Sequence, residues 1–486
     1  MLTTACAYAI LSHRYMVTHT SRQHALFYAP LDKQASLLKD DLLEPIDRLL
    51  DDSELVDLVR CRLETRRPGS ARIGRPSIAP DRLLRCCVLK HIKGWSYRQL
   101  ERELRSNLVY RRFTRFDADP TPDFTTLSRN FALLGEGVMQ LIHERVVLMG
   151  KAKRVVAGAK LRVDTTVVET NIHHPTDSTL LADGVRVLTR MLKGIAKECE
   201  PAALAVVDHA RAVKRRVLEI TRAARGVTES SKQRMKESYR GLVKLTEGVL
   251  EQATAVVEGA GLVVVGSMTK VAILMEQLRH FAALVSKVIG QTRQRVFEGN
   301  RFVADKVLSL FEPHTQVIRK GKAHKPTEFG RLVRVDEVEN GVVSRIEVLK
   351  GNPADTTSWE PALRGHIATF GKAPRMATAD RGFFSAANER LAQQLGVQRV
   401  ALPVRGRLSQ KRRALQKSRW FQRAQKWRSG IEARIATLKN RFDMARARYK
   451  GSAGFDRYVH WCTISHNLVS IARASARRSN RGSKHR

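Results

Sequence analysis

The sequence predicts an α/β protein that begins with an all-helical segment and is interrupted by a helical insertion. Runs rich in β-branched residues, and an alternating segment on either side of Asn340-Gly341, are typical of strands. Long stretches with apolar residues three or four positions apart are typical of helices. The chain of 486 residues has room for roughly two to four domains. We expect a helical domain over residues 1–150, an α/β domain over 151–184 and 312–470, a helical insertion over 185–311 and a basic tail over 471–486.

The helical start contains two groups of elements. Residues 37–63 repeat apolar positions at helical spacing, which predicts two or three short helices. After a connector rich in Pro and Gly, residues 82–92 predict a helix that ends at Gly94, and Ser96 caps a second helix that runs to about residue 104. Two helices around a tight turn suit a helix-turn-helix that offers basic side chains to DNA, or equally an ordinary helical hairpin.

The second of these helices carries the candidates for base contacts. Leu100 and Leu104 should face the first helix. Arg98 and Arg102 are therefore expected on the exposed side, where a helix-turn-helix would reach base edges in the major groove.

The α/β part begins with residues 154–170, RVVAGAKLRVDTTVVET, which predict a buried strand ending near Glu169. Asp164 is an acid in the apolar interior of this strand. A buried carboxylate is costly to ionise without a positive partner. Asp164 is therefore expected either to bind a metal ion or to form a buried ion pair.

Strand signals resume after the helical insertion. Residues 329–352 alternate around Asn340-Gly341, which predicts a hairpin, and a helix capped by Asp355 should follow. A short strand then ends at Asp380, before a helix capped by Ser385 and a strand over residues 397–402. Open α/β sheets place ligand sites at the carboxyl ends of their strands. We therefore expect Asp380 to be functional.

A helix over residues 425–439, QKWRSGIEARIATLK, carries the third acid of interest. Helical spacing places Arg428, Glu432 and Lys439 on one polar stripe, beside an apolar stripe of Ile431, Ile435 and Leu438. Glu432 is the only acid of this basic helix. It is expected either to pair with Arg428 or to bind a hard cation.

Charge narrows the class of partner. The formal net charge is +40, and residues 405–486 hold 23 Lys and Arg against three acids, a net of +20. A polyanion is the expected partner, and nucleic acid fits better than a membrane surface because no lipid-anchor motif or long amphipathic basic helix accompanies the charge. Six cysteines without a CxxC pair argue against a zinc site and against a disulfide framework. The composition therefore favours a reduced, cytosolic DNA- or RNA-binding protein.

The three acids suggest a chemistry. Carboxylate oxygens are the ligands that Mg²⁺ selects. Two Mg²⁺ ions about 3.5 to 4 Å apart can activate an attacking oxygen and stabilise a leaving one in a phosphodiester displacement. Asp164, Asp380 and Glu432 in a basic chain thus predict phosphoryl transfer on nucleic acid.

The chain resembles bacterial insertion-sequence transposases of the DDE class, and within them the ISNCY group. The resemblance rests on RVDTTVVETNIHHPTDSTLLADGVRVL around Asp164, on GKAHKPTEFG before the hairpin, on ATADRGFFS around Asp380, and on the R-x3-E-x6-K pattern of Arg428, Glu432 and Lys439. It also includes the segment around GRPSIAPDRLL, so that it covers most of residues 70–470.

The resemblance implies a ribonuclease-H-like catalytic domain, a mixed sheet flanked by helices. It implies that Asp164, Asp380 and Glu432 bind two Mg²⁺ ions, for which Mn²⁺ can substitute, and that Arg428 and Lys439 contact DNA near the cleaved phosphate. The family has a Tyr three residues before the Arg, where this chain has Gln425. The function of that Tyr is therefore in doubt here.

The resulting functional prediction is a transposase that binds the inverted-repeat ends of its element and catalyses Mg²⁺-dependent DNA cleavage and 3′-hydroxyl strand transfer. Its partners would be double-stranded DNA, as element ends and target, and a second copy in a synaptic homodimer. It would act in the bacterial cytoplasm, at the nucleoid. The alternatives are a catalytically inactive DNA-binding regulator and a structure-specific nuclease of the same fold. Phosphate contacts are expected from three lysines before the hairpin: Lys320, Lys322 and Lys325.

Overall fold

The computed structural model of the chain describes residues 38–65, 78–199, 204–258, 264–300, 302–319, 326–404 and 406–483. The backbone forms two compact units, one of residues Met1–Thr170 with Val317–Arg486 and one of residues Asn171–Gln316. None of the helices in the described part of the chain combines the length and the apolar composition that a membrane span requires.

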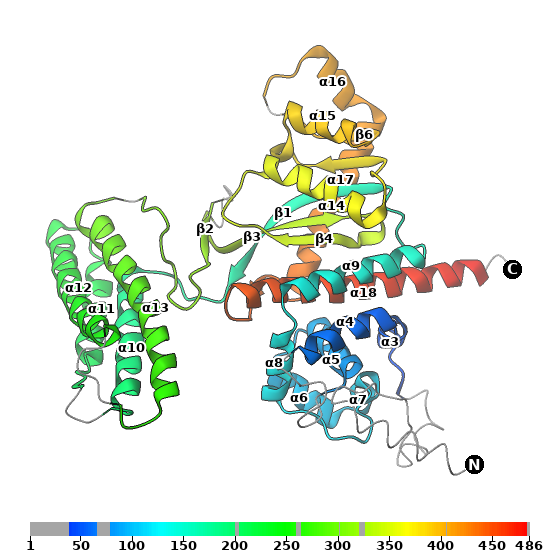
Figure 1. Ribbon diagram of the computed structural model, residues 1–486. Helices are drawn as coiled ribbons and strands as arrows, with labels where there is room; N and C mark the ends of the chain where they lie inside the picture. Colours follow the sequence, from blue (N-terminus) through cyan, green and yellow to red (C-terminus); the bar gives the residue numbers. More distant parts are fainter. Residues whose placement is uncertain are drawn as a thin grey trace, which may run out of the picture. The chain divides into compact units, whose positions relative to one another are not determined.

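A mixed sheet forms the centre of the first unit (Figure 1). β1 lies between β3, which is antiparallel to it, and β5, which is parallel to it; β4 pairs with β3, and β6 pairs in parallel with β5. Short β2 pairs with β3, and short β7 pairs in parallel with β1. The strands are β1 (Lys160–Thr170), β2 (Gln316–Ile318), β3 (Glu328–Glu337), β4 (Val343–Val348), β5 (Met376–Ala379), β6 (Arg399–Ala401) and β7 (Arg446–Ala447).

The hairpin expected around Asn340-Gly341 is confirmed. A 3-10 turn, η4 (Glu339–Gly341), joins β3 to β4, and Asn340 and Gly341 have φ of 56° and 75°. Asn and Gly tolerate this left-handed region better than other residues. The strand predicted around Asp164 is β1, whose interior residues Val163 and Val168 are fully buried.

Helices cover both faces of the sheet, and β1 shows which helix lies on which face. Side chains alternate along a strand. Thr165 contacts Asp355, just before α14, whereas Arg162 donates a hydrogen bond to the carbonyl of Trp427 in α17. Hence α14 and α17 lie on opposite faces. The helical elements after the hairpin are η5 (Asp355–Ser358), α14 (Trp359–Phe370), η6 (Arg381–Phe383), α15 (Ala386–Gln394), α16 (Gln410–Lys417), α17 (Arg419–Arg441) and α18 (Ser452–Ser483).

The prediction that Asp355 caps the helix after the hairpin is wrong. The 3-10 turn η5 precedes α14, whose N-cap is Ser358. The carboxylate of Asp355 instead accepts a hydrogen bond from the hydroxyl of Thr165 at 2.8 Å. A tertiary partner thus takes the place of the local backbone. By contrast, Ser385 caps α15 as expected, accepting from the backbone N–H of Asn388 at 3.0 Å.

The N-terminal segment is helical, as predicted. Gly94, at φ 67°, ends α5, and Ser96 and Gln99 form a capping box at the start of α6. Leu100 and Leu104 are fully buried, as the helical pattern requires. The helices are α3 (Leu43–Leu49), α4 (Ser53–Glu64), α5 (Pro80–Lys93), α6 (Tyr97–Ser106), α7 (Leu108–Thr114), α8 (Phe124–Leu133) and α9 (Glu136–Ala152).

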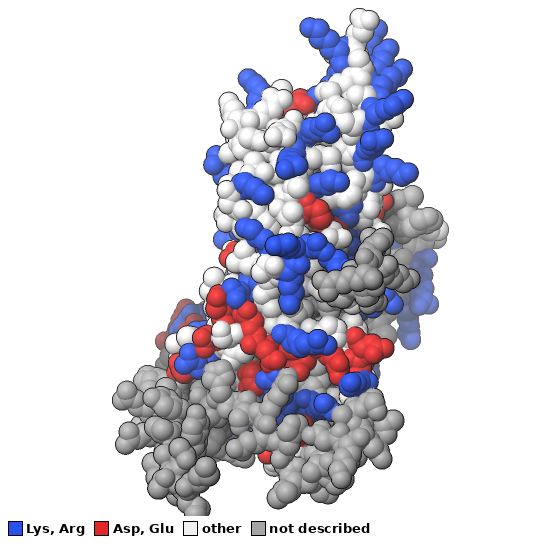
Figure 2. Space-filling view, turned by 90° about the vertical axis from the view of Figure 1, so that its right-hand side faces the viewer, with Lys and Arg blue, Asp and Glu red and all other residues white. Residues whose placement is uncertain are grey.

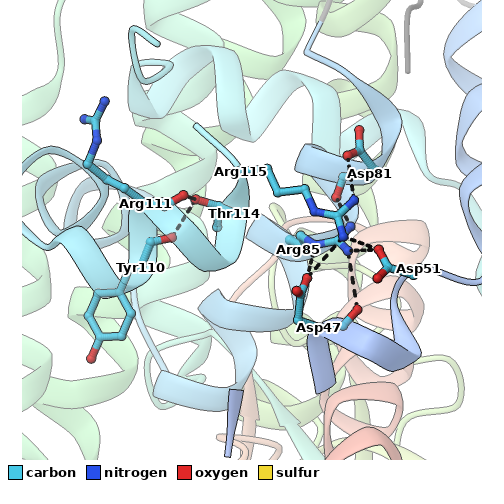
Figure 3. A network of polar contacts seen from close by, with 8 residues as sticks. All are labelled: Asp47, Asp51, Asp81, Arg85, Tyr110, Arg111, Thr114 and Arg115. Carbon is cyan, nitrogen blue, oxygen red and sulfur yellow. Dashed lines mark hydrogen bonds and ion pairs between the residues drawn. The ribbon is translucent and has the colours of Figure 1, made fainter. Parts of the chain in front are cut away.

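A buried ion network holds the first helices together (Figure 3). Arg85 is fully buried and lies 2.8 Å from a carboxylate oxygen of Asp47 and 2.8 Å from one of Asp51. Arg115 pairs with Asp51 as well, and its guanidinium lies 3.5 Å from Asp81. Shared acids compensate both guanidinium groups, which would otherwise be costly to bury.

Two helices join this segment to the sheet. α18 packs against α5 and α9, and both α9 and α18 contact β4. Figure 1 shows α9 and α18 side by side along the sheet. The boundary expected at residue 150 thus falls inside α9, and α18 continues through residues 471–483 of the expected tail.

The second unit is a set of helices with its own apolar core. The unit contains α10 (Asp177–Ala196), α11 (Ala210–Ala223), α12 (Glu229–Val257), α13 (Met268–Thr292) and a π-helical turn, η3 (Arg293–Phe297). Leu188, Leu242 and Leu278 are fully buried between them. The insertion predicted from helical periodicity is helical, and its first helix begins at Asp177, before the expected residue 185.

Candidate active site

Two of the predicted acids directly follow the last residue pair of the parallel ladder between β1 and β5. The ladder between β1 and β5 ends at the pair Val163 and Ala379. Asp164 and Asp380 are the next residues on the two chains. Adjacent strands are about 4.8 Å apart, so that the two carboxylates start from neighbouring backbone positions. Asp380 leaves the strand at this point and caps η6, accepting from the N–H of Gly382 at 2.7 Å.

The third acid, Glu432, is carried by α17 to the same end of the ladder between β1 and β5. Ile431 and Leu438 are fully buried, so the predicted apolar stripe faces the core. Gln425 holds the first half of α17 against the sheet, since its Nε2 donates to the hydroxyl of Thr378 at 3.0 Å and to the carbonyl of Ala401 at 2.8 Å. The residue in place of the family's Tyr therefore anchors α17 to β5 and β6.

Arg428 joins two of the acids. Its guanidinium nitrogens lie 3.9 Å from Oδ2 of Asp164 and 3.2 Å from Oε1 of Glu432. The side chains of Arg428 and Asp164 are 19% and 17% exposed, whereas that of Glu432 is 68% exposed. The ion pair expected between Arg428 and Glu432 is present, and the same guanidinium also lies near Asp164 of β1.

The donor set fits a hard cation. Carboxylate oxygens are the ligands that Mg²⁺ prefers, with water and substrate phosphate in its remaining positions. A positive group, the guanidinium of Arg428, already lies between the oxygens of Asp164 and Glu432. Across the described ranges, no three His, Cys, Asp or Glu side chains are grouped closely enough to hold a metal by themselves. Binding a cation would therefore require Arg428 to move away and the exposed Glu432 to turn inward.

A fourth carboxylate lies beside this edge. Oδ1 of Asp355 accepts from Thr165, the residue after Asp164, and its Oδ2 lies beside Gly382. The sequence pattern missed Asp355, because an acid before a helix is the ordinary signal of a cap. Only the pairing of distant segments identifies it.

Three other predicted residues, Lys439, Arg98 and Arg102, lie away from these acids. Lys439 is on the same helix as Glu432 but seven positions, about 10 Å, further along. Arg98 and Arg102 are exposed on α6; Arg98 stacks on Phe124, with 3.9 Å between its Cζ and the ring centre, and Arg102 lies 3.1 Å from Glu103. Lys320, Lys322 and Lys325 lie outside the described residues.

Comparison with known families gives two matches. Residues 31–133 match a transposase domain (DUF772), and residues 312–468 match a transposase DDE domain. Comparison with curated proteins and with solved structures gives no match. The DDE match contains Asp380 and Glu432 but not Asp164, which precedes the helical insertion; the structure places the missing strand, β1, between β3 and β5.

These matches agree with the fold. The mixed sheet with helices on both faces is the ribonuclease-H-like architecture that the DDE domain implies. The matches do not distinguish the ISNCY group from others. Two transposase domains in one chain, the second completed by β1 across the helical insertion, lead to one conclusion: the chain belongs to the insertion-sequence transposases of the DDE class.

Proposed function

We propose that the chain binds the inverted-repeat ends of its own element and catalyses Mg²⁺-dependent strand cleavage, followed by strand transfer through the 3′-hydroxyl group. The observation that carries the proposal is the contact of one guanidinium, that of Arg428, with both Asp164 on the central strand and Glu432 on α17. Asp380 directly follows β5, the strand that pairs with β1, and β1 carries Asp164. Asp164 thus neighbours Asp380 in the sheet and shares Arg428 with Glu432, which supports a joint site for the three acids.

Asp164, Asp380 and Glu432 are the residues that would hold two Mg²⁺ ions, or Mn²⁺ in their place. When bound, the ions would supply activation of the attacking oxygen and stabilisation of the leaving oxygen. Arg428 would contact the phosphate at the cleavage position, because a guanidinium presents paired N–H donors that match phosphate oxygens. Lys439, two turns further along α17, would contact a neighbouring phosphate as a point charge.

A basic surface leads away from this edge along α16 and α17. Its residues are exposed, and in the described part of the chain no carboxylate lies within ion-pair distance of any of them: Lys411, Arg413, Lys417, Arg419, Arg423 and Lys426. Figure 2 shows Lys and Arg predominating over the upper part of the visible face, at the height where Figure 1 shows α15 and α16, and acids gathered in a band lower down. Phosphate contacts of this kind supply affinity and position the duplex.

Recognition of the element ends is assigned to α5 and α6. Their turn and caps give two helices in the spacing of a helix-turn-helix, and Arg102, with a side chain 71% exposed, lies on the second one. Two ends must be cut and joined, which calls for two copies of the site. We therefore include a homodimer in the synaptic complex, acting at the nucleoid where the element lies.

The test uses duplexes that carry the terminal inverted repeats flanking the gene. Wild-type protein should nick them with Mg²⁺ or Mn²⁺ and not with EDTA. Asp164→Asn, Asp380→Asn and Glu432→Gln should each abolish cleavage while binding of the duplex stays near wild type. Glu360→Gln is the matched control, since Glu360 is an acid of α14 paired with Arg364 at 2.7 Å.

Full cleavage by one of the three variants would remove that residue from the site. Binding without cleavage by the wild-type protein under all metal conditions would favour the inactive regulator. Cleavage without joining to a target duplex would favour the nuclease.

A further inference from the structure

The backbone ladder brings Asp164 and Asp380 to neighbouring positions but ends just before them. The parallel ladder between β1 and β5 stops at Val163 and Ala379, one residue short of both acids. Beyond that pair, β1 continues to Thr170 beside β3, whereas the chain after β5 turns into η6. Beyond the ladder, the two acids can be connected on the β5 side by side-chain contacts.

Asp355 makes this connection. Its Oδ1 accepts a hydrogen bond at 2.8 Å from the hydroxyl of Thr165, which is 7% exposed and directly follows Asp164. Its Oδ2 lies against Gly382, the residue whose N–H binds Oδ1 of Asp380. The two oxygens of Asp355 thus face the two halves of the site.

Gly382 permits this close approach. A Cβ at this position would lie 2.8 Å from Oδ2 of Asp355 and 2.9 Å from Oδ1 of Asp380. By the sum of these distances, the two oxygens are at most 5.7 Å apart. A side chain here would displace at least one of these carboxylates, and the constraint comes from space rather than from backbone angle.

Asn388 holds the segments that carry the two acids. Its side-chain N–H groups donate to the carbonyl of Thr356 in η5 at 2.8 Å and to that of Phe383 in η6 at 2.9 Å. Trp359, fully buried, donates to the carbonyl of Asn388 at 3.1 Å. These bonds hold η5, which carries Asp355, to η6, which follows Asp380.

We infer that Asp355 is a positioning residue, which through its hydrogen bond with Thr165 and its contact with Gly382 sets the separation of Asp164 and Asp380 for cation binding. The inference rests on the proposed function, because it concerns the same acids. The physical role is that of an outer partner, whose loss in metal sites typically weakens binding about 10- to 100-fold.

The experiment is a titration of the full chain with Mn²⁺, without DNA, followed by electron paramagnetic resonance of the free ion. Asp355→Ala and Thr165→Val should each weaken Mn²⁺ binding roughly 10-fold or more, because each removes the hydrogen bond. Asp355→Asn and Thr165→Ser keep an acceptor and a hydroxyl, and they should bind within about 3-fold of wild type. Gly382→Ala should also weaken Mn²⁺ binding, because the added methyl group would displace the carboxylate of Asp355 or that of Asp380.

Two control variants separate this role from general damage. Thr357→Val removes a neighbouring hydroxyl of η5 that donates to the carbonyl of Ala354 in its own turn, and Glu360→Gln removes an acid of α14. Both should bind Mn²⁺ like wild type. For variants that bind and cleave, the Mg²⁺ concentration giving half-maximal cleavage should shift in the same order as Mn²⁺ affinity.

The outcomes are distinct. Equal weakening by Asp355→Asn and Asp355→Ala would show that charge, and not the hydrogen bond, matters, and would overturn the inference. Wild-type affinity in Asp355→Ala and Thr165→Val would overturn it as well, while leaving the proposed function intact. A wild-type protein that neither binds Mn²⁺ nor cleaves end DNA would overturn the proposed function and this inference with it.

Discussion

Replacing Arg428 by Ala should strengthen metal binding and weaken catalysis, in opposite directions. In the metal-free protein the guanidinium compensates Asp164 and Glu432. A cation must displace it. The contact with Glu432, an exposed pair four residues apart on one helix, is worth about 0.3–0.5 kcal/mol. The contact with Asp164 at 3.9 Å, between two side chains less than one fifth exposed, is worth about 1 kcal/mol.

Together these contacts oppose metal binding by about 1.4 kcal/mol, which corresponds to a factor of about ten in affinity. Arg428→Ala should therefore bind Mn²⁺ about 10-fold more tightly than wild type in the absence of DNA. Cleavage of end DNA at saturating metal should fall roughly 100-fold, because a donor to the reacting phosphate is lost.

The assay combines a Mn²⁺ titration of the DNA-free protein with single-turnover cleavage. Arg423→Ala is the matched control: Arg423 is an exposed Arg on the same helix, and no carboxylate of the described residues pairs with it. Arg423→Ala should change metal affinity little. Weaker Mn²⁺ binding in Arg428→Ala than in wild type would refute the reasoning, because the guanidinium would then support the metal site and not compete with it.

Three further predictions concern DNA and pH. In filter binding, the triple variant Lys411→Ala, Arg413→Ala, Lys417→Ala should have a slope of log affinity against log salt that is reduced by about 2 to 3, at about 0.9 per lost phosphate contact. The control is the same change to Ala at three residues exposed on α12 and α13: Lys244, Arg279 and Lys287. Arg102→Ala should lower the preference for end DNA over random duplex by about 1–3 kcal/mol in competition binding, with Arg279→Ala unchanged; an unaltered ratio would exclude Arg102 as a base contact. Burial lowers the pKa of His143 to about 4 and that of His460 to about 3, from an ordinary value of 6.5. The unfolded chain therefore takes up protons below pH 6.5 that the folded chain does not. The contribution of these two histidines to the free energy of unfolding should be fully present above pH 6.5 and should fall by about 1.4 kcal/mol per pH unit for each His between pH 6.5 and 4. Urea titration tests this, with the exposed His173→Gln as a control that keeps the slope.

Local patterns in the sequence were sufficient for most elements. The caps at Ser96 and Ser385, the left-handed Gly94 and the turn at Asn340-Gly341 depend on residues within a few positions of one another, and all are as predicted. The apolar stripe of α17 follows from helical spacing alone. The three acids could be singled out because each is chemically unusual in its own segment.

Contacts between distant segments were decided only by the tertiary structure. Asp355 and Gln425 look like a cap and a polar helix residue, yet one binds Thr165 of β1 and the other binds β5 and β6. The sequence determined which residues could carry metal chemistry, because residue type and local spacing are written in the chain. The structure decided how Asp164, Asp380 and Glu432 are arranged, because strand order, helix docking and the approach of Asp355 to Gly382 depend on packing between segments far apart in sequence.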